Sequence, residues 1–360
     1  MAFLRQQIKD NNGYNHYIER KWLAFVSLAV ILVVVSLISI SVGSSRLPLA
    51  EILRVLFGGG EDVSRTIVFN VRMPRIATGI AVGFALAMAG CIMQNVLRNP
   101  LASASTLGIA QGASFGAALA IVYFQAGVHI GAATVTTISI ANPYMVTIFA
   151  FLGGITSTIL ILLLSRVSGV TPTSMILAGV ALSAMFTGAT ALVQYFADDV
   201  RIASIVYWTF GNLGRASFNE ITLIFIVSAL AFVYFIFNRW NYNAMESGTH
   251  TAKSLGVNVD ALILISMTVA TLISAVAIAF VGTINFIGLI APHIVRRFVG
   301  NDHRFLIPCS AIMGAVIILV ADIASRMISA PAVLPIGALT SFLGAPLFIY
   351  LIIKKGKEAR

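Results

Sequence analysis

Charged residues are scarce in this chain. Asp, Glu, Lys and Arg make up only 10% of its 360 residues, whereas 59% are hydrophobic. The mean hydropathy is +0.96. Several apolar runs of about 18 or more residues are each long enough to cross a hydrocarbon core of about 30 Å. Because helices satisfy their own backbone hydrogen bonds in lipid, the sequence predicts an all-α polytopic membrane protein.

Motifs that would indicate an enzyme or a cofactor site are also missing. The segment most like a phosphate-binding loop is Thr251-Ala252-Lys253-Ser254, in which Ala252 stands where the motif needs glycine. HExxH, CxxC and GxSxG are absent, and Cys91 and Cys309 lie in or beside apolar runs, so no disulfide framework is indicated. We therefore expect no enzyme activity and no cofactor bound by this chain. The net charge of +10 favours basic membrane-flanking loops over nucleic-acid binding.

Hydropathy divides the chain into about ten predicted membrane spans. They cover residues 22–44, 75–97, 102–125, 143–165, 174–197, 220–238, 260–281, 284–300, 305–327 and 335–353. The first run is too long for the apolar region of a signal peptide. The predicted organisation is an N-terminal cytoplasmic segment (1–21), one transmembrane domain (22–355) and a cytoplasmic tail (356–360).

The distribution of positive charge predicts the orientation of these spans. An even number of spans puts both termini on the same side of the membrane. With the termini inside, 15 of the 23 Lys and Arg residues, including every lysine, face the cytoplasm. The positive-inside rule therefore favours cytoplasmic termini.

A long polar interruption, Arg239 to Asp260, separates two apolar runs in the second half of the chain. Its later part predicts a short helix, with Thr249 as the N-terminal cap and Gly256 as the left-handed residue that closes it. A short capped helix between two spans is not a bilayer element. On the predicted topology it faces the cytoplasm, where we expect it to dock a partner protein.

Two further patterns concern the membrane interior. The first is a polar stripe on the fifth span, and the tenth span has a comparable stripe of Gly337, Thr340 and Gly344. The stripe on the fifth span consists of Ser183, Thr187, Thr190 and Gln194. It fits the wall of a wet pathway, but hydroxyl groups bonded back to their own helix and helix–helix contacts are an alternative.

The second pattern is Asp322, an intramembrane acid four residues before Arg326. A charge at this depth is costly and is usually functional. The spacing favours a structural ion pair over a proton relay. Arg72 and Arg75 flank the predicted outer mouth of the second span, and Arg326 lies at the outer end of the ninth. Arginines suit carboxylate recognition, so these three could receive an extracytoplasmic partner.

Several motifs in a fixed order resemble the FecCD-type permeases, which are membrane subunits of bacterial and archaeal ABC importers for iron–siderophores, haem and vitamin B12. The resemblance covers about residues 25 to 355. The motifs that carry it are Arg72-Met73-Pro74-Arg75, the segment from Gln94 to Ala102, the segment from Gly288 to Arg296, Asp302-His303-Arg304, Ala321-Asp322, the segment from Leu334 to Gly337, and the segment from Leu343 to Pro346.

This resemblance implies a type II ABC importer permease architecture in a bacterial or archaeal cell membrane. It implies a second permease subunit, identical or related, two cytoplasmic ABC ATPase subunits that use ATP, and an extracytoplasmic binding protein. Residues 239–258 align with the coupling helices. Within them, the residues implied to contact the ATPase are Ala252, Lys253, Leu255 and Gly256.

The resemblance also implies that Arg72, Arg75 and Arg326 dock the binding protein and that the fifth and tenth spans line the pathway. Val333 departs from the cobalamin permease, which carries an acid there, and this counts against cobalamin. The expected cargo is a metal chelate such as an iron–siderophore, with cobalamin and haem as alternatives. An ion-coupled secondary transporter using Asp322 is the competing class.

Overall fold

The computed structural model describes residues 2–43, 47–124, 142–167, 171–330 and 332–358. Every regular element in these ranges is a helix, which confirms the predicted fold class. Seven helical segments are long and apolar enough to cross a membrane: Tyr17–Ser41, Asp62–Val96, Pro143–Leu164, Pro172–Tyr195, Phe218–Phe237, Val259–Val281 and His303–Met327.

All ten predicted spans coincide with helices, although two of these helices, α5 and α13, are shorter than predicted. The ten are α1 (Ala2–Ser41), α4 (Met73–Val96), α5 (Ile109–Tyr123), α6 (Pro143–Val167), α7 (Pro172–Tyr195), α9 (Phe218–Phe237), α12 (Val259–Val281), α13 (Ile287–Val299), α14 (His303–Met327) and α15 (Ile336–Glu358). Residues 102–108, predicted as part of a span, form turns before α5. At about 1.5 Å per residue, the 13 residues of α13 reach only about 20 Å.

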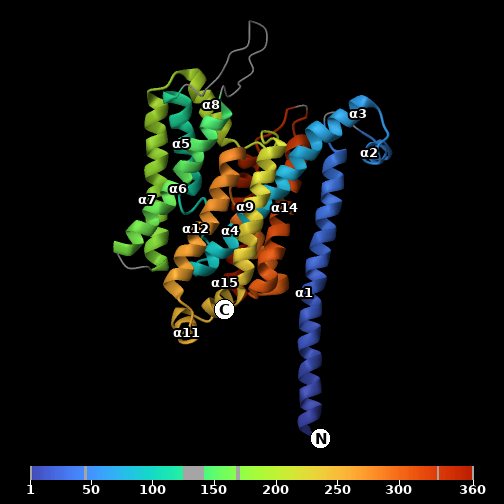
Figure 1. The fold of residues 1–360 in the computed structure, drawn as a ribbon, viewed down its shortest axis with the longest axis vertical. Coiled ribbons are helices and arrows are strands. Elements are labelled where there is room, and N and C mark those ends of the chain that lie inside the picture. The colour runs from blue at the N-terminus through green and yellow to red at the C-terminus, as the bar shows by residue number, and fades with distance from the viewer. Residues whose placement is uncertain (1, 44–46, 125–141, 168–170, 331, 359–360) are drawn as a thin grey trace.

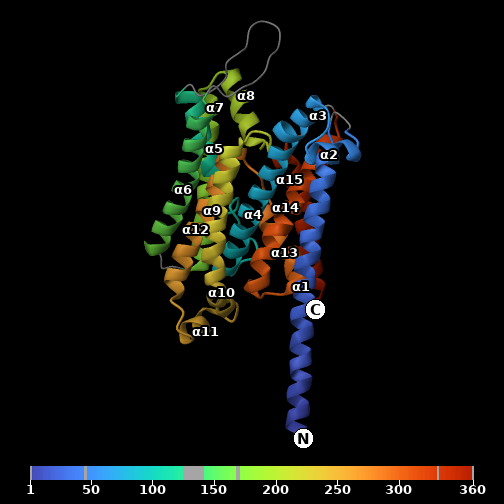
Figure 2. The same ribbon diagram turned by 45° about the vertical axis from the view of Figure 1, so that its right-hand side comes forward.

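Six shorter elements lie at the two ends of the bundle (Figures 1 and 2). Those at one end are α2 (Leu49–Leu56), α3 (Asp62–Thr66), the π-helical segment η1 (Ile67–Arg72) and α8 (Asp199–Thr209). At the opposite end lie α10 (Arg239–Glu246), α11 (Thr249–Ser254) and both chain termini. We call these the α8 end and the α11 end. Residues 2–21, predicted as a separate segment, continue the helix of the first span.

The centre of the bundle is α4, which packs against α14, α12, α13 and α9. Its small residues allow this packing: a Cβ on Gly90 would collide with the backbone of Gly288, and one on Gly83 with the backbone of Ala315. Close backbone approach through small residues is a common way to pack membrane helices. The result is a rigid core from which α7 and α15 lie apart, since α7 packs on α5 and α6 while α15 packs on α13 and α14.

Candidate functional site

The polar interruption between α9 and α12 folds as two short helices, α10 and α11, at the α11 end. Gly256 adopts the predicted left-handed conformation, with φ of 84°. It closes α11 through two hydrogen bonds: its N–H donates to the Lys253 carbonyl at 3.0 Å, and the Val257 N–H donates to the Ala252 carbonyl at 3.0 Å. The predicted cap is wrong by one position. Gly248 is the N-cap, with a positive φ of 112° that favours glycine, and Thr249 is the first helical residue.

The four residues implied to contact an ATPase differ in exposure. Ala252 lies on the inner face of α11 and is fully buried, whereas Leu255, which follows α11, is 68% exposed. Lys253 is exposed and pairs with Asp260 at 3.6 Å, which ties α11 to the start of α12. Open space surrounds Gly256. The helix therefore presents an apolar tip, with its anchoring residue turned inward.

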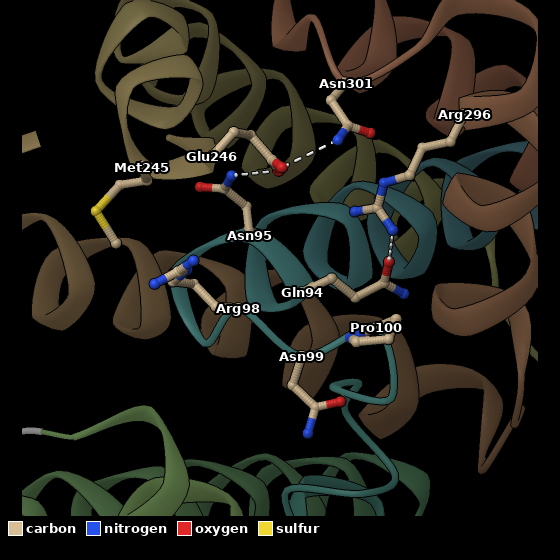
Figure 3. Close-up of a pocket in the computed structure, with 9 residues that line it drawn as sticks. All are labelled: Gln94, Asn95, Arg98, Asn99, Pro100, Met245, Glu246, Arg296 and Asn301. Atoms are coloured by element: carbon tan, nitrogen blue, oxygen red, sulfur yellow. Dashed lines mark hydrogen bonds between the residues drawn. The ribbon is translucent and has the colours of Figure 1, made fainter. Parts of the chain in front are cut away.

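A polar pocket of about 240 Å³ lies beside α10, between the end of α4 and the end of α13 (Figure 3). Glu246, the last residue of α10, bridges two asparagines: Asn95 Nδ2 donates to its Oε1 at 3.0 Å and Asn301 Nδ2 to its Oε2 at 3.0 Å. Arg296 Nη1 donates to Gln94 Oε1 at 2.7 Å. We call this set the Glu246 junction. It connects α10 to α4 and to the loop before α14.

A second junction ties α10 to α1 and α14. Lys21, which is only 1% exposed, forms an ion pair of 3.1 Å with Asp302. Asn243 Nδ2 donates to the other oxygen of Asp302 at 3.1 Å. Burial alone would raise the pKa of Asp302, but hydrogen bonds from Asn243, Lys21 and the Arg304 backbone outweigh it and hold that pKa below its ordinary value. This is the Asp302 junction, and it keeps a carboxylate ionised under α10.

At the α8 end, Asp322 is completely buried and lies between two arginines. Arg75 Nε donates to its Oδ1 at 2.7 Å, and Arg326 Nη2 lies 2.9 Å from its Oδ2. The predicted pair between Asp322 and Arg326 is therefore present. Arg75, from a helix 247 residues earlier in the chain, completes a three-residue cluster that spacing alone did not indicate.

Arg72 and Arg326 also hold the end of α1. Arg72 donates to the carbonyls of Ile40 and Ser41, and Arg326 donates to the carbonyls of Ser39 and Val42 and to the Ser39 hydroxyl. Cations stabilise the carbonyl-rich end of a helix. Arg72 is 5% exposed. The three arginines predicted to dock a partner are therefore engaged within the chain, and their docking role stays a prediction.

The predicted polar stripe follows α7, but its hydroxyl groups bond to their own helix. Ser183 donates to the Gly179 carbonyl, Thr187 to that of Ser183, and Thr190 to that of Phe186, each within 2.7–2.8 Å. This is the alternative that the pattern left open. Thr187 nevertheless remains exposed, and Gln194 is half-buried. The face thus offers small side chains whose hydrogen bonds are already made.

The two predicted pathway residues of α15 are buried inside the chain. Gly337 has no space for a side chain, because a Cβ there would meet the carbonyls of Thr283 and Phe210. The Thr340 hydroxyl donates to the Gly337 carbonyl at 3.1 Å. Neither residue faces the exposed side of α15, where Phe342 is 77% exposed. That α15 lines the pathway stays a prediction, and Gly337 and Thr340 would reach the pathway only if the elements packed against them moved.

Both junctions escaped the sequence reasoning. Their members are Lys21, Gln94, Asn95, Asn243, Glu246, Arg296, Asn301 and Asp302. Gln94, Asn95, Arg296 and Asp302 fall within the motifs that carry the family resemblance, yet those motifs assigned them no role. The sequence signal that could have found several of them is an amide side chain at the end of an apolar run, because such a group needs a hydrogen-bond partner once it is buried.

Comparison with known proteins agrees with this architecture. The FecCD transport family matches residues 31–354. The chain belongs to this family. An ABC transporter permease protein of Methanocaldococcus jannaschii is 50% identical over 345 residues, which cover 96% of this chain and 98% of that protein. The iron(3+)-hydroxamate import system permease protein FhuB of Bacillus subtilis is 33% identical, covering 97% of this chain and 89% of that protein.

A relative from a third organism and a solved structure extend the likeness. The hemin transport system permease protein HmuU of Yersinia pestis is 32% identical, covering 92% of this FecCD family chain and 95% of that protein. A solved structure described as an inward-facing metal-chelate type ABC transporter has a TM-score of 0.77 and 29% identity. It covers 93% of this chain and 99% of that chain.

Proposed function

We propose that this chain is the membrane permease subunit of an ABC importer for a metal chelate such as an iron–siderophore. The family match across residues 31–354 carries this proposal. Relatives named for import of iron(3+)-hydroxamate, iron(3+)-citrate and hemin support the metal-chelate class, and they leave haem as an alternative cargo. Nothing in the relatives named above favours cobalamin.

We propose that separate cytoplasmic ATPase subunits supply the energy for transport. The sequence has no phosphate-binding loop, so ATP hydrolysis belongs to a partner. The exposed Leu255 on the tip of α11 offers that partner an apolar contact, and the open space around Gly256 leaves room for it. On this proposal the α11 end and both termini face the cytoplasm, in agreement with the charge distribution.

The binding protein is placed at the α8 end. Arg72, Arg75 and Arg326 lie there, but their guanidinium groups are bound to Asp322 and to the end of α1. Docking through these residues therefore requires acidic groups of the binding protein to exchange with contacts inside the chain. Such an exchange would couple docking to movement of α1 against α4 and α14.

The substrate path is placed between this chain and a second permease subunit. The face of α7 around Thr187 and Gly188 is uncovered within one chain, and nothing lies within 4 Å of a Cβ placed on Gly188. Its hydroxyl groups are satisfied by the helix itself, so the surface is mildly polar without offering a specific binding site. Such a wall suits passage of a cargo that has been selected elsewhere.

The competing class, an ion-coupled secondary transporter, finds no support at Asp322. Arg75 donates to one carboxylate oxygen and Arg326 lies 2.9 Å from the other, so Asp322 pairs with two cations inside the chain and is not the lone acid that ion coupling would use.

Reconstitution in proteoliposomes tests the proposal. The chain is combined with its cognate ATPase and binding protein, and uptake of ferric hydroxamate, ferric citrate and haem is measured. We expect uptake of one of these chelates to require ATP and the binding protein. Uptake driven by a proton gradient without ATP would refute the proposal, and transport of none of the three would remove the assignment to metal chelates.

A further inference from the structure

The end of α4 contains an arginine where the backbone favours glycine. The helix closes with two hydrogen bonds: the Arg98 N–H donates to the Asn95 carbonyl at 3.0 Å and the Asn99 N–H to the Gln94 carbonyl at 3.1 Å. This closure puts Arg98 in the left-handed region, with φ of 47°. At the same end of the molecule, α11 closes with the same pair of bonds and has Gly256 at the corresponding position.

An arginine in this conformation is strained, whereas glycine is not. Such strain persists only where surrounding structure or function compensates for it. Within the part of the chain that the structure describes, no hydrogen bond or ion pair of the Arg98 guanidinium is present, and the residue is exposed. Among the described residues, the charge of Arg98 is therefore available to a partner.

Arg98 lines the polar pocket of about 240 Å³ at the α11 end. Figure 3 shows Arg98 and Arg296 on opposite sides of this pocket, with Asn95 and Glu246 between them. Among the described residues, neither arginine has a carboxylate within 4.0 Å. The two oxygens of Glu246 already accept from Asn95 and Asn301. The pocket thus contains two arginines and one acidic residue, and both carboxylate oxygens of that acid already accept hydrogen bonds.

The pocket also contains an unfilled acceptor. Asn95 is 3% exposed, and its Nδ2 donates to the Tyr242 carbonyl and to Glu246. Its Oδ1 is buried without a partner among the described residues. Buried polar atoms normally have partners. This oxygen is covered by the chain itself, so the group that the pocket leaves open to an acidic ligand is the exposed guanidinium of Arg98.

We propose that this pocket is a docking site for an acidic segment of the cytoplasmic ATPase subunit, with Arg98 receiving its carboxylate. This inference rests on the proposed function and adds a contact beside the end of α10 to the one at the tip of α11. A free anion of the cytoplasm offers the same charge and is the alternative that the test distinguishes. The position beside α10 and α11, the two short helices that cover this end, favours a protein partner.

The test separates the backbone role of Arg98 from its charge. The full-length permease is placed in nanodiscs, and its affinity for the purified cognate ATPase is measured at about 0.05 M and about 0.5 M salt. In Arg98→Gly, the left-handed position gains its preferred residue, so the melting temperature of the permease should hold or rise. Its affinity for the ATPase should nevertheless fall about fivefold at the lower salt concentration.

Charge reversal and a neighbouring arginine complete the design. Arg98→Glu should weaken association about tenfold or more at low salt, and the loss should shrink at high salt. The matched control is Arg297→Glu. Arg297 is also exposed near the end of α13, but it does not line the pocket, so this variant should bind the ATPase as the unchanged permease does.

The outcomes distinguish the inference from the proposed function. Failure of the unchanged permease to bind any ATPase would remove the proposed function itself. If the unchanged permease binds the ATPase and both Arg98 variants bind it with the same affinity as the unchanged permease, the docking site is wrong and the proposed function stands. If inorganic phosphate raises the melting temperature of the unchanged permease but not of Arg98→Gly, and ATPase affinity is the same in both, the pocket binds a free anion and the inference is wrong.

Discussion

Replacement of Asp322 by asparagine tests the buried cluster at the α8 end most directly. The carboxylate is 0% exposed and lies 2.7 Å from Arg75 and 2.9 Å from Arg326, whose side chains are 17% and 10% exposed. Asp322→Asn keeps the shape but leaves two cations facing each other. Removal of one partner from a buried ion pair costs about 3–5 kcal/mol. We expect the lower part of that range, because both arginines retain some solvent.

Chemical denaturation of the purified chain in detergent measures this cost. The control is Asp260→Asn, which removes the ion pair between α11 and α12, where both side chains are more than half exposed. A surface pair contributes only about 0–1 kcal/mol, so this variant should unfold almost as the unchanged chain does. Adding Arg75→Gln to Asp322→Asn should recover about 1–3 kcal/mol, since it removes one of the two unbalanced cations.

Two results would refute this reasoning. If Asp322→Asn is as stable as the unchanged chain, the cluster does not hold α4 to α14. The second result compares uptake by the two proteins. If the unchanged chain shows uptake driven by an ion gradient and not by ATP, and the folded Asp322→Asn variant loses that uptake, Asp322 is an ion-coupling residue and the permease proposal is wrong.

Three further predictions concern other parts of the molecule. In Gly256→Val, a β-branched residue is forced to a φ of 84°, so the end of α11 should rearrange and ATP hydrolysis by the associated ATPase should no longer drive uptake; normal uptake would remove α11 from the coupling route. In Thr187→Cys, a membrane-impermeant thiol reagent should label the chain during transport, whereas Leu192→Cys, exposed on another side of α7, should stay unlabelled. The native Cys91 and Cys309 are buried and give no background. Equal labelling of the two variants would contradict a wet pathway along the Thr187 face. Because the pKa of Asp302 lies below its ordinary value of 3.8, the stability that Asp302 contributes is complete above about pH 4 and is lost as the pH falls through the lowered pKa. Asp302→Asn should therefore reduce the loss of stability on acidification. An unchanged dependence of stability on acid pH would contradict this assignment.

Local patterns in the sequence were sufficient for the membrane helices and for the end of α11. Long apolar runs predict spans because the bilayer sets their length, and the left-handed Gly256 follows from a glycine placed just after a short helix. The pair of Asp322 with Arg326 was also accessible, since a spacing of four residues puts both on one face of a helix.

Contacts between distant segments were not accessible in this way. Arg75 reaches Asp322 across 247 residues, and Glu246 meets Asn95 across 151. Spacing carries no information on such pairs. The outer arginines show the consequence, because their place at a helix mouth does not reveal that Arg75 reaches Asp322 or that Arg72 and Arg326 bind the end of α1. The short helices α2 and α8 were missed because brief amphipathic segments have too few residues for a hydropathy window.

The arrangement around α10 explains how a movement of α11 would reach the membrane helices. Among the described residues, α11 packs mainly against α10 and α12. α10 is fixed at two places, by Glu246 to the ends of α4 and α13 and by Asn243 to Asp302 at the start of α14. Because α4 and α14 form the packed centre of the bundle, a displacement of α10 cannot be absorbed locally without breaking one of these junctions. The two junctions therefore make α10 a second connection between α11 and the core, beside the direct contact of α11 with α12, and Arg98 lines the pocket at the Glu246 junction.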